Sequence, residues 1–296
     1  MERSHITTRE VEGRGVCAFA AKSFSAGDIV LLERALVVSA LGAPGNLNRD
    51  LWFALAQLER SNQVPAFEPN QHMGALAALR DLGPAVCRAK LLTKTVGDEV
   101  ALPSAAEARR DARVLRQIVS NGTLGQSAGS FTPGEYARLR QVMKVNGFRF
   151  NAALGKDDHG YDMGEVVFDR VSRINHSCEP NVTFHVSWSE EYNTMINSIV
   201  AARDMELGEE VCISYLPLSM PAVQRRRDFQ RHWGFTCDCL SCQRDSAESV
   251  VPVVSRAVQA VEIVKSIIIA EDDMNSSASS EVGVCWDDLH DPIVVG

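Results

Sequence analysis

Apolar residues along this chain follow two spacings, one typical of strands and one typical of helices. Short runs rich in branched and aromatic residues occur near the N-terminus and return after residue 145. The early runs predict strands at Val16 to Ala20 and Asp28 to Val38, and the turn at Ala26-Gly27-Asp28 favours their antiparallel pairing. Later strands are predicted at Val166 to Phe168, Val182 to Ser187, Met195 to Ala201 and Glu210 to Tyr215.

Between these strand regions, residues 47–145 change to helical spacing. Turns such as Asn121-Gly122-Thr123 and Thr132-Pro133-Gly134 separate the apolar groups, so we predict several helices inserted into a strand-rich domain. The apolar positions that recur at this spacing are Leu51, Phe53, Leu55 and Leu58, then Leu76, Leu79 and Leu82, then Val114, Leu115, Ile118 and Val119.

The rest of the chain follows a charged helix predicted at Ala222 to Trp233. We divide the chain into five segments, with 1–46 and 146–218 as two parts of one strand-rich domain and 47–145 as the helical insertion. A cysteine-rich region spans 219–245. The last segment, 246–296, is predicted to hold a helix followed by an acidic, mobile tail.

Composition narrows the class of protein. The 296-residue chain carries a formal net charge of −8 with a pI of about 5.4, so it lacks the basic field of a general nucleic-acid binder. An acidic surface suits a cationic substrate, although solubility alone is the simpler explanation. No apolar run approaches 18 residues and Met1 to Glu10 is polar, which predicts an intracellular protein of the nucleus or cytoplasm without membrane contact. We expect a monomer.

Three of the eight cysteines fall within six residues, at Cys237, Cys239 and Cys242. A C-x-C-x-x-C run supplies three thiolate ligands from one loop, and a tetrahedral zinc ion needs a fourth. Cys178 is the best candidate for that ligand. Disulfide pairing is the alternative, but a C-x-C bridge closes a strained ring and an intracellular chain keeps its thiols reduced.

Four motifs in the same order resemble those of SET-domain protein lysine methyltransferases. They are Gly13-Arg14-Gly15-Val16, the run from Asn175 to Asn181 (N-H-S-C-E-P-N), the run from Gly208 to Tyr215 (G-E-E-V-C-I-S-Y), and Phe235 to Cys242 (F-T-C-D-C-L-S-C). The resemblance implies an α+β fold, a SET-domain β-clip of small, mostly antiparallel sheets with a zinc-binding post-SET loop. A split SET domain whose zinc uses the cysteine of N-H-S-C is similar to the SET-and-MYND subfamily, yet the MYND finger and the long C-terminal helical domain are missing from this sequence.

The resemblance also implies two bound groups, S-adenosylmethionine and a structural Zn²⁺. The cofactor is expected to contact Arg14, Asn175, His176 and Phe235, and Tyr215 is expected to contact it and to act as the catalytic residue. In-line methyl transfer needs a neutral amine and tight alignment, which a phenol at a strand end can provide. Trp233 is expected to wall the lysine channel with Tyr215, although packing that anchors the cysteine loop explains Trp233 equally well.

One further cofactor contact has two candidates in this sequence. Asn151 has the family's spacing before the N-H-S-C motif but lacks the usual following aromatic, and Asn146 has that aromatic at the wrong distance. We favour Asn151. Ala153 then replaces a bulky channel residue, which widens the channel toward products beyond monomethyl-lysine, and Phe168 is a candidate to fill the gap.

The predicted function is methyl transfer from S-adenosylmethionine to a lysine amine of a histone or non-histone protein. One alternative is a catalytically weak SET module that serves as a protein-interaction scaffold. A second is a zinc-stabilised nucleic-acid-binding module, suggested by the basic run Gln224 to Asp228. That run is short and lies in an acidic protein, so capping or solvation of its helix is the better interpretation.

Overall fold

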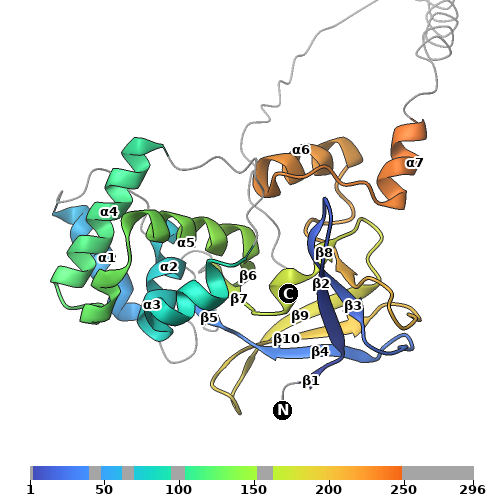
Figure 1. The fold of residues 1–296 in the computed structure, drawn as a ribbon, viewed down its shortest axis with the longest axis horizontal. Coiled ribbons are helices and arrows are strands. Elements are labelled where there is room, and N and C mark those ends of the chain that lie inside the picture. The colour runs from blue at the N-terminus through green and yellow to red at the C-terminus, as the bar shows by residue number, and fades with distance from the viewer. Residues whose placement is uncertain (1–2, 40–47, 62–69, 95–103, 152–162, 249–296) are drawn as a thin grey trace, which may run out of the picture. The chain divides into compact units, whose positions relative to one another are not determined.

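The computed structural model describes residues 3–39, 48–61, 70–94, 104–151 and 163–248 (Figure 1). The chain divides into two compact units, one of Met1–Cys237 with Val294–Gly296 and the other of Asp238–Ile293. Within the second unit the structure describes α7 (Leu240–Glu248). The helix and tail expected beyond residue 249 lie outside the described residues.

Four small sheets build the strand-rich part of the first unit, among the residues that the structure describes. All pairings are antiparallel except that of β8 with β11, which confirms the predicted α+β class with small, mostly antiparallel sheets. The first sheet has the order β1 (Arg3–Ser4), β4 (Ile29–Arg34), β10 (Thr194–Ala201), β9 (Val182–Ser189), and the others pair β2 (Ile6–Val11) with β3 (Gly15–Ala20), β5 (Val37–Ser39) and β6 (Phe148–Asn151) with β7 (Met163–Val167), and β8 (Asn175–His176) with β11 (Cys212–Ile213).

The predicted hairpin between Val16 to Ala20 and Asp28 to Val38 is wrong. β3 pairs instead with β2, and β4 pairs with β1 and β10. The strand β2 was missed because its sequence is mostly polar and its central side chains are exposed, so it carries little apolar alternation. The turn near Gly27 is real. However, the Gly27 N–H donates to the carbonyl of Ala201 on β10, so the strand that follows the turn, β4, pairs with β10 and not with β3.

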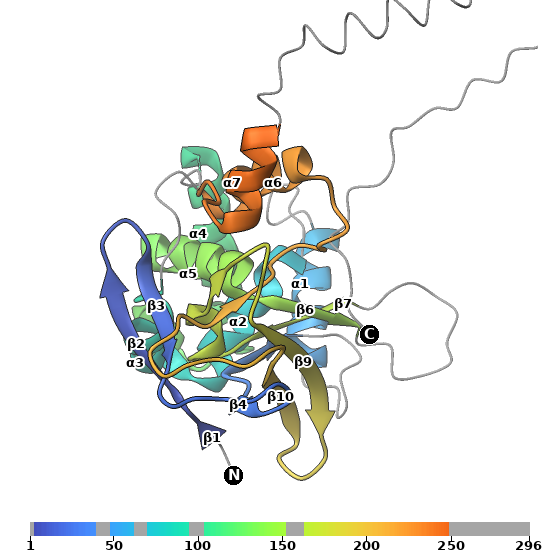
Figure 2. The same ribbon diagram turned by 90° about the vertical axis from the view of Figure 1, so that its right-hand side faces the viewer.

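The helices of the insertion gather on one side of the sheets (Figures 1 and 2). Their buried leucines and valines match the predicted helical spacing, with Leu51, Leu76 and Ile118 fully buried, whereas Phe53 is 53% exposed. Ser104 and Thr132 form capping boxes that fix the starts of α4 and α5. The described helical elements of the insertion are α1 (Arg49–Arg60), α2 (Asn70–Asp81), α3 (Gly83–Val86) with the π-helical turn Cys87–Leu91, α4 (Ala105–Ser120), the 3₁₀ helix Gln126–Ser130 and α5 (Pro133–Asn146).

A buried polar network crosses the core of the helical insertion. The His72 Nδ1 atom on α2 lies 2.9 Å from the Tyr136 hydroxyl on α5, and Asp111 on α4 pairs with Arg140. His72 is 1% exposed, and its burial lowers the pKa of the imidazole to about 3 with help from the positive charges of Arg140 and Arg110. The network therefore joins three helices around a neutral imidazole.

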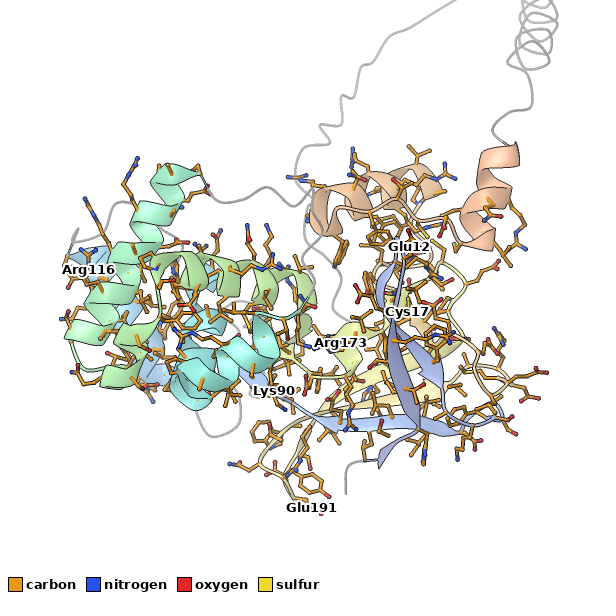
Figure 3. All side chains as sticks on the ribbon, in the orientation of Figure 1. Glu12, Cys17, Lys90, Arg116, Arg173 and Glu191 are labelled. Carbon is orange, nitrogen blue, oxygen red and sulfur yellow. The ribbon has the colours of Figure 1, made fainter. Side chains whose placement is uncertain are left out.

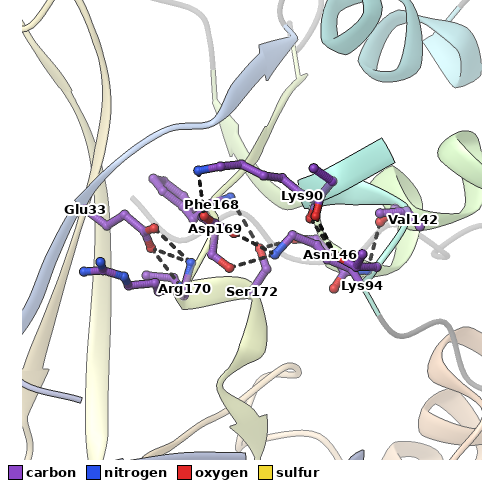
Figure 4. A network of polar contacts seen from close by, with 12 residues as sticks. Glu33, Lys90, Lys94, Val142, Asn146, Phe168, Asp169, Arg170 and Ser172 are labelled. Atoms are coloured by element: carbon purple, nitrogen blue, oxygen red, sulfur yellow. Dashed lines mark hydrogen bonds and ion pairs between the residues drawn. The ribbon is translucent and has the colours of Figure 1, made fainter. Parts of the chain in front are cut away.

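A second network joins the insertion to the strand-rich part (Figure 4). Lys94 is only 2% exposed, and its Nζ atom donates to the Asp169 carbonyl at 2.7 Å. Lys90 pairs with the Asp169 carboxylate at 3.0 Å. The Glu33 carboxylate accepts hydrogen bonds from the backbone N–H groups of Arg170 and Val171. These contacts fix the segment that leads into β8.

After α6 (Ala222–Trp233), a left-handed Gly234 turns the chain toward the cysteine run. Within α6, Arg225 is 7% exposed and its guanidinium donates to the Met220 carbonyl. Burial of Arg225 excludes solvation as the role of this one residue, whereas Arg227 in the same run has 63% of its side chain exposed. No helix in the described part of the chain has the length and apolarity needed to cross a membrane.

Candidate functional site

The centre of the candidate site is the parallel pairing of β8 with β11, which sets Asn175 beside Cys212 and His176 beside Ile213. Asn181 holds the two segments together from the loop that follows β8. Its side-chain amide donates to the Glu210 carbonyl at 2.7 Å and accepts from the Cys212 N–H at 2.9 Å. Two sequence motifs that lie about 30 residues apart are thus joined through one buried asparagine, which is 4% exposed.

His176 has both ring nitrogens in defined contacts. Its Nδ1 atom accepts the Tyr215 backbone N–H at 3.0 Å, and its Nε2 atom lies 3.3 Å from the Cys178 sulfur. Because an amide N–H can only donate, Nδ1 is the unprotonated nitrogen and Nε2 carries the hydrogen. Burial is the main cause that lowers the pKa of His176 to about 4, so the ring is neutral near pH 7.

Tyr215 lies within a group of aromatic rings. Its hydroxyl donates to the Ile174 carbonyl at 2.8 Å, and burial raises its pKa, so the phenol keeps its proton. The ring centroid is 5.3 Å from that of Trp233 and 6.4 Å from that of Phe235. The structure thus brings together Tyr215 and Trp233, which we expected at the lysine channel, and Phe235, which we expected to contact the cofactor.

Phe229 completes this aromatic group, and the sequence analysis missed it. It is fully buried, with its ring 4.2 Å from His176 and stacked 5.1 Å from Phe235. Phe229 lies one helical turn before Trp233 on α6. That spacing on a helix otherwise rich in charged residues was the signal that could have identified it.

Arg14 and Asn175 meet at a shared carboxylate. The Glu210 Oε2 atom lies 2.6 Å from the Arg14 Nη1 atom, and its Oε1 atom accepts from the Asn175 Nδ2 atom at 3.4 Å. The Asn175 amide also donates to the sulfur of buried Cys17 at 3.1 Å (Cys17 is labelled in Figure 3). Arg14 lies between Gly13 and Gly15, both at positive φ, and 43% of its side chain is exposed.

The remaining predicted residues lie in or beside the β5-β7-β6 sheet. Asn151 ends β6. The Asn146 side chain donates to the Val142 carbonyl at the end of α5. Phe168 is fully buried, and its ring meets that of Phe148 edge to face at 5.8 Å. Among the described ring pairs Phe168 does not contact Tyr215 or Trp233, so its place in a channel stays a prediction, and Ala153 lies outside the described residues.

The four cysteines expected to bind metal come together. The sulfur atoms of Cys178, Cys237, Cys239 and Cys242 all lie within 4.8 Å of one another. Zinc–sulfur bonds of about 2.3 Å in a tetrahedron place the sulfurs roughly 3.8 Å apart, so this set fits a single tetrahedral ion. The four residues are buried or partly buried, which is typical of a closed structural site.

Comparison with known proteins gives a family match. The model of the SET domain family matches residues 15–216 of this chain. The histone-lysine N-methyltransferase SET5 of Meyerozyma guilliermondii is 30% identical over 135 residues, which cover 46% of this chain and 27% of that protein. The histone-lysine N-methyltransferase ATXR4 of Arabidopsis thaliana is 36% identical over 121 residues, which cover 36% of this chain and 35% of that protein.

Among solved structures, one match is the SET domain of LSMT bound to methyllysine and AdoHcy. Its TM-score is 0.46 at 14% sequence identity, covering 80% of this chain and 53% of that one. The chain spans about a quarter of the SET5 protein and about a third of ATXR4.

Proposed function

The chain belongs to the SET-domain family, and from this premise we propose that it transfers a methyl group from S-adenosylmethionine to a lysine side-chain amine of a protein. The observation that carries the proposal is the hydrogen bond from the Tyr215 backbone N–H to the His176 Nδ1 atom. Tyr215 is the last residue of the G-E-E-V-C-I-S-Y motif, and His176 is the second residue of the N-H-S-C motif. Relatives named as histone-lysine methyltransferases support a histone or other intracellular protein as the substrate.

The residues present fit the cofactor. Arg14 offers a partly exposed guanidinium for a carboxylate, flanked by glycines that allow a close approach to the backbone. Asn175 and His176 would line the site with amide and backbone groups, and Phe235 would offer an aromatic face. Asn151 is the further contact that we favour over Asn146, because the Asn146 side chain already bonds to its own helix. When bound, S-adenosylmethionine supplies the electrophilic methyl group.

The chain's own residues would align the reaction. The Tyr215 ring is fixed by the bond from its hydroxyl to Ile174 and by the rings of Trp233 and Phe235. This fixed edge would border the lysine channel together with Trp233 and Phe168, exclude water and direct the amine toward the methyl group. Because the phenol keeps its proton, Tyr215 would act by orientation and dipole and would not act as a base.

The four cysteines would hold one structural Zn²⁺ that takes no part in the chemistry. Four sulfur ligands would fill all four positions around a tetrahedral ion and would leave no place for water or substrate. The neutral His176 imidazole faces the Cys178 sulfur through its Nε2–H. That contact would link the metal to the cofactor residues.

The test is methyl transfer from labelled S-adenosylmethionine to core histones and to a whole-cell extract. The Tyr215→Phe variant should reduce transfer by about a hundredfold while cofactor affinity stays within about twofold, because alignment is lost and binding is not. Tyr192→Phe, which removes a hydroxyl from the β9–β10 turn, is the matched control. Cofactor binding without transfer to any protein would favour the scaffold alternative. Full turnover by Tyr215→Phe would refute the mechanism.

A further inference from the structure

The ends of α5 and α6 meet beside the predicted lysine channel. The Trp233 indole N–H donates to the Val145 carbonyl at 3.2 Å, which brings the last turn of α6 against the last turn of α5. On its other side the Trp233 ring packs on Tyr215 at 5.3 Å. The last turns of α5 and α6 therefore border the place where a target lysine would enter.

Three cations lie on these two helix ends or on the strand that follows α5. Lys144 precedes Val145, Arg231 lies two residues before Trp233, and Arg149 lies on β6 just after α5. All three side chains belong to exposed residues, and none has an ion pair or hydrogen bond within the described part of the chain. We name Lys144, Arg149 and Arg231 the basic rim.

The three charges act on one common neighbour. The His232 ring meets Trp233 edge to face at 5.7 Å. Partial burial is the main cause that lowers the pKa of His232. The positive charges of Arg231, Lys144 and Arg149 lower this pKa further, and the negative charge of Asp228 opposes the shift. Cations on three separate elements thus converge around His232.

Within the described part of the chain, two acidic groups near the rim leave most of its charge unbalanced. Asp228 lies one turn before His232, but its carboxylate is 3.7 Å from the Arg227 guanidinium, and only 16% of the Asp228 side chain is exposed. Glu165 lies opposite Arg149 in the β6–β7 register, where the charge of Arg149 opposes the burial that raises the Glu165 pKa to about 7. Arg149 is thus partly balanced, and Lys144 and Arg231 carry most of the excess charge. This local excess of positive charge stands in a chain with a net charge of −8.

We propose that the basic rim selects protein substrates in which acidic residues flank the target lysine. The inference rests on the proposed function and names its substrate class. Exposed, unpaired cations around a channel mouth attract carboxylates at close range and repel flanking lysines and arginines. A polyanionic nucleic acid would also be attracted, but the rim is a short cluster beside an aromatic channel and lacks the extended basic stripe of a nucleic-acid site.

The experiment compares three sets of peptides with a central lysine that differ only in the residues beside it. The flanking residues are Asp and Glu in the acidic set, Gly and Ser in the neutral set, and Lys and Arg in the basic set. Binding to the full chain is measured in the presence of S-adenosylhomocysteine, and KM is measured for methyl transfer. We expect the acidic set to bind about tenfold more tightly than the basic set at low salt, with the difference shrinking as salt rises.

The double variant Lys144→Glu with Arg231→Glu should abolish or invert the preference for acidic peptides. Both residues are exposed, so folding should be kept, and unchanged affinity for S-adenosylhomocysteine verifies it. Arg116→Glu is the matched control, because Arg116 lies on the far side of the helical insertion from α6 (Figure 3). Its peptide preference should equal that of the native chain.

Equal binding of the three peptide sets, or a preference that survives the double reversal, would overturn the inference and leave methyl transfer standing. Displacement of the acidic peptides by short duplex DNA at physiological salt would assign the rim to nucleic acid and would also overturn it. Failure of the proposed function has a different signature: no transfer to any peptide or extract. The binding measurement still decides the role of the rim in that case, because it needs no turnover.

Discussion

Glu210 shows how much of the candidate site depends on a residue that has no expected chemistry of its own. The motif G-E-E-V was identified, but Arg14 and Asn175 were treated as separate cofactor contacts. In the structure one carboxylate holds both, and Asn181 holds the backbone that carries it. A motif predicts that residues converge, but it does not say which side chains bond to which, because that depends on contacts between segments nearly 200 residues apart.

The Glu210→Gln variant tests this shared carboxylate. The substitution keeps the shape of the side chain and removes the charge that fixes the Arg14 guanidinium. Because Arg14 is partly exposed and solvent screens the pair, we expect cofactor affinity to fall by about three- to tenfold, measured by calorimetry with S-adenosylmethionine. Glu206→Gln, an exposed carboxylate in the preceding loop, should leave affinity unchanged. Equal affinity of the Glu210 variant and the native chain would show that Arg14 does not need this partner.

At the scale of elements, helices were predictable and strand pairing was not. The repeat of Leu51, Leu55 and Leu58 is a local signal, and all three are buried in α1. Strand pairing is set by contacts between distant segments, so the turn at Gly27 could not reveal that β4 pairs with β10. Polar β2 gave no signal because most of its side chains are exposed to solvent.

The buried imidazole of His72 predicts a pH dependence of stability within the helical insertion. Its pKa is about 3 in the folded chain and near 6.5 when unfolded, so the unfolded chain binds more protons between these values. The free energy of unfolding should therefore decrease as pH falls below 6.5, by up to about 1.4 kcal/mol per pH unit, until the folded imidazole also protonates near pH 3.

The measurement is urea denaturation of the native chain and of His72→Phe between pH 7 and pH 5. His72→Phe should be less stable at pH 7, because it loses the contact with the Tyr136 hydroxyl, but its stability should depend less on pH. His185→Gln, which removes an exposed histidine on β9, should follow the native curve. If both variants keep the native slope, His72 is not the source of the dependence.

At the scale of the whole molecule, the candidate site depends on segments from both ends of the sequence. The turn between β2 and β3 supplies Arg14, β3 supplies Cys17, β8 supplies Asn175 and His176, and α6 supplies Trp233. The insertion reaches this region through Lys94 and Asp169 and through the Trp233 bond to Val145. The order of the motifs was sufficient to predict that these segments meet. The contacts of the insertion were not predictable, because they use backbone carbonyls that no sequence pattern marks.

The metal site gives the prediction that spans most of this assembly. Cys178 follows His176 by two residues, and its sulfur lies 3.3 Å from the His176 Nε2 atom, so zinc held there would fix the histidine that positions Tyr215. Cys178→Ser should therefore lower bound zinc well below one equivalent and weaken S-adenosylmethionine binding by about tenfold or more. Elemental analysis and calorimetry on the same sample check both effects.

Cys87→Ala, which alters a fully buried thiol in the helical insertion, should retain zinc and cofactor affinity. A Cys178→Ser chain with full zinc content would exclude Cys178 as the fourth ligand, and full zinc loss with native cofactor affinity would separate the metal from the cofactor residues.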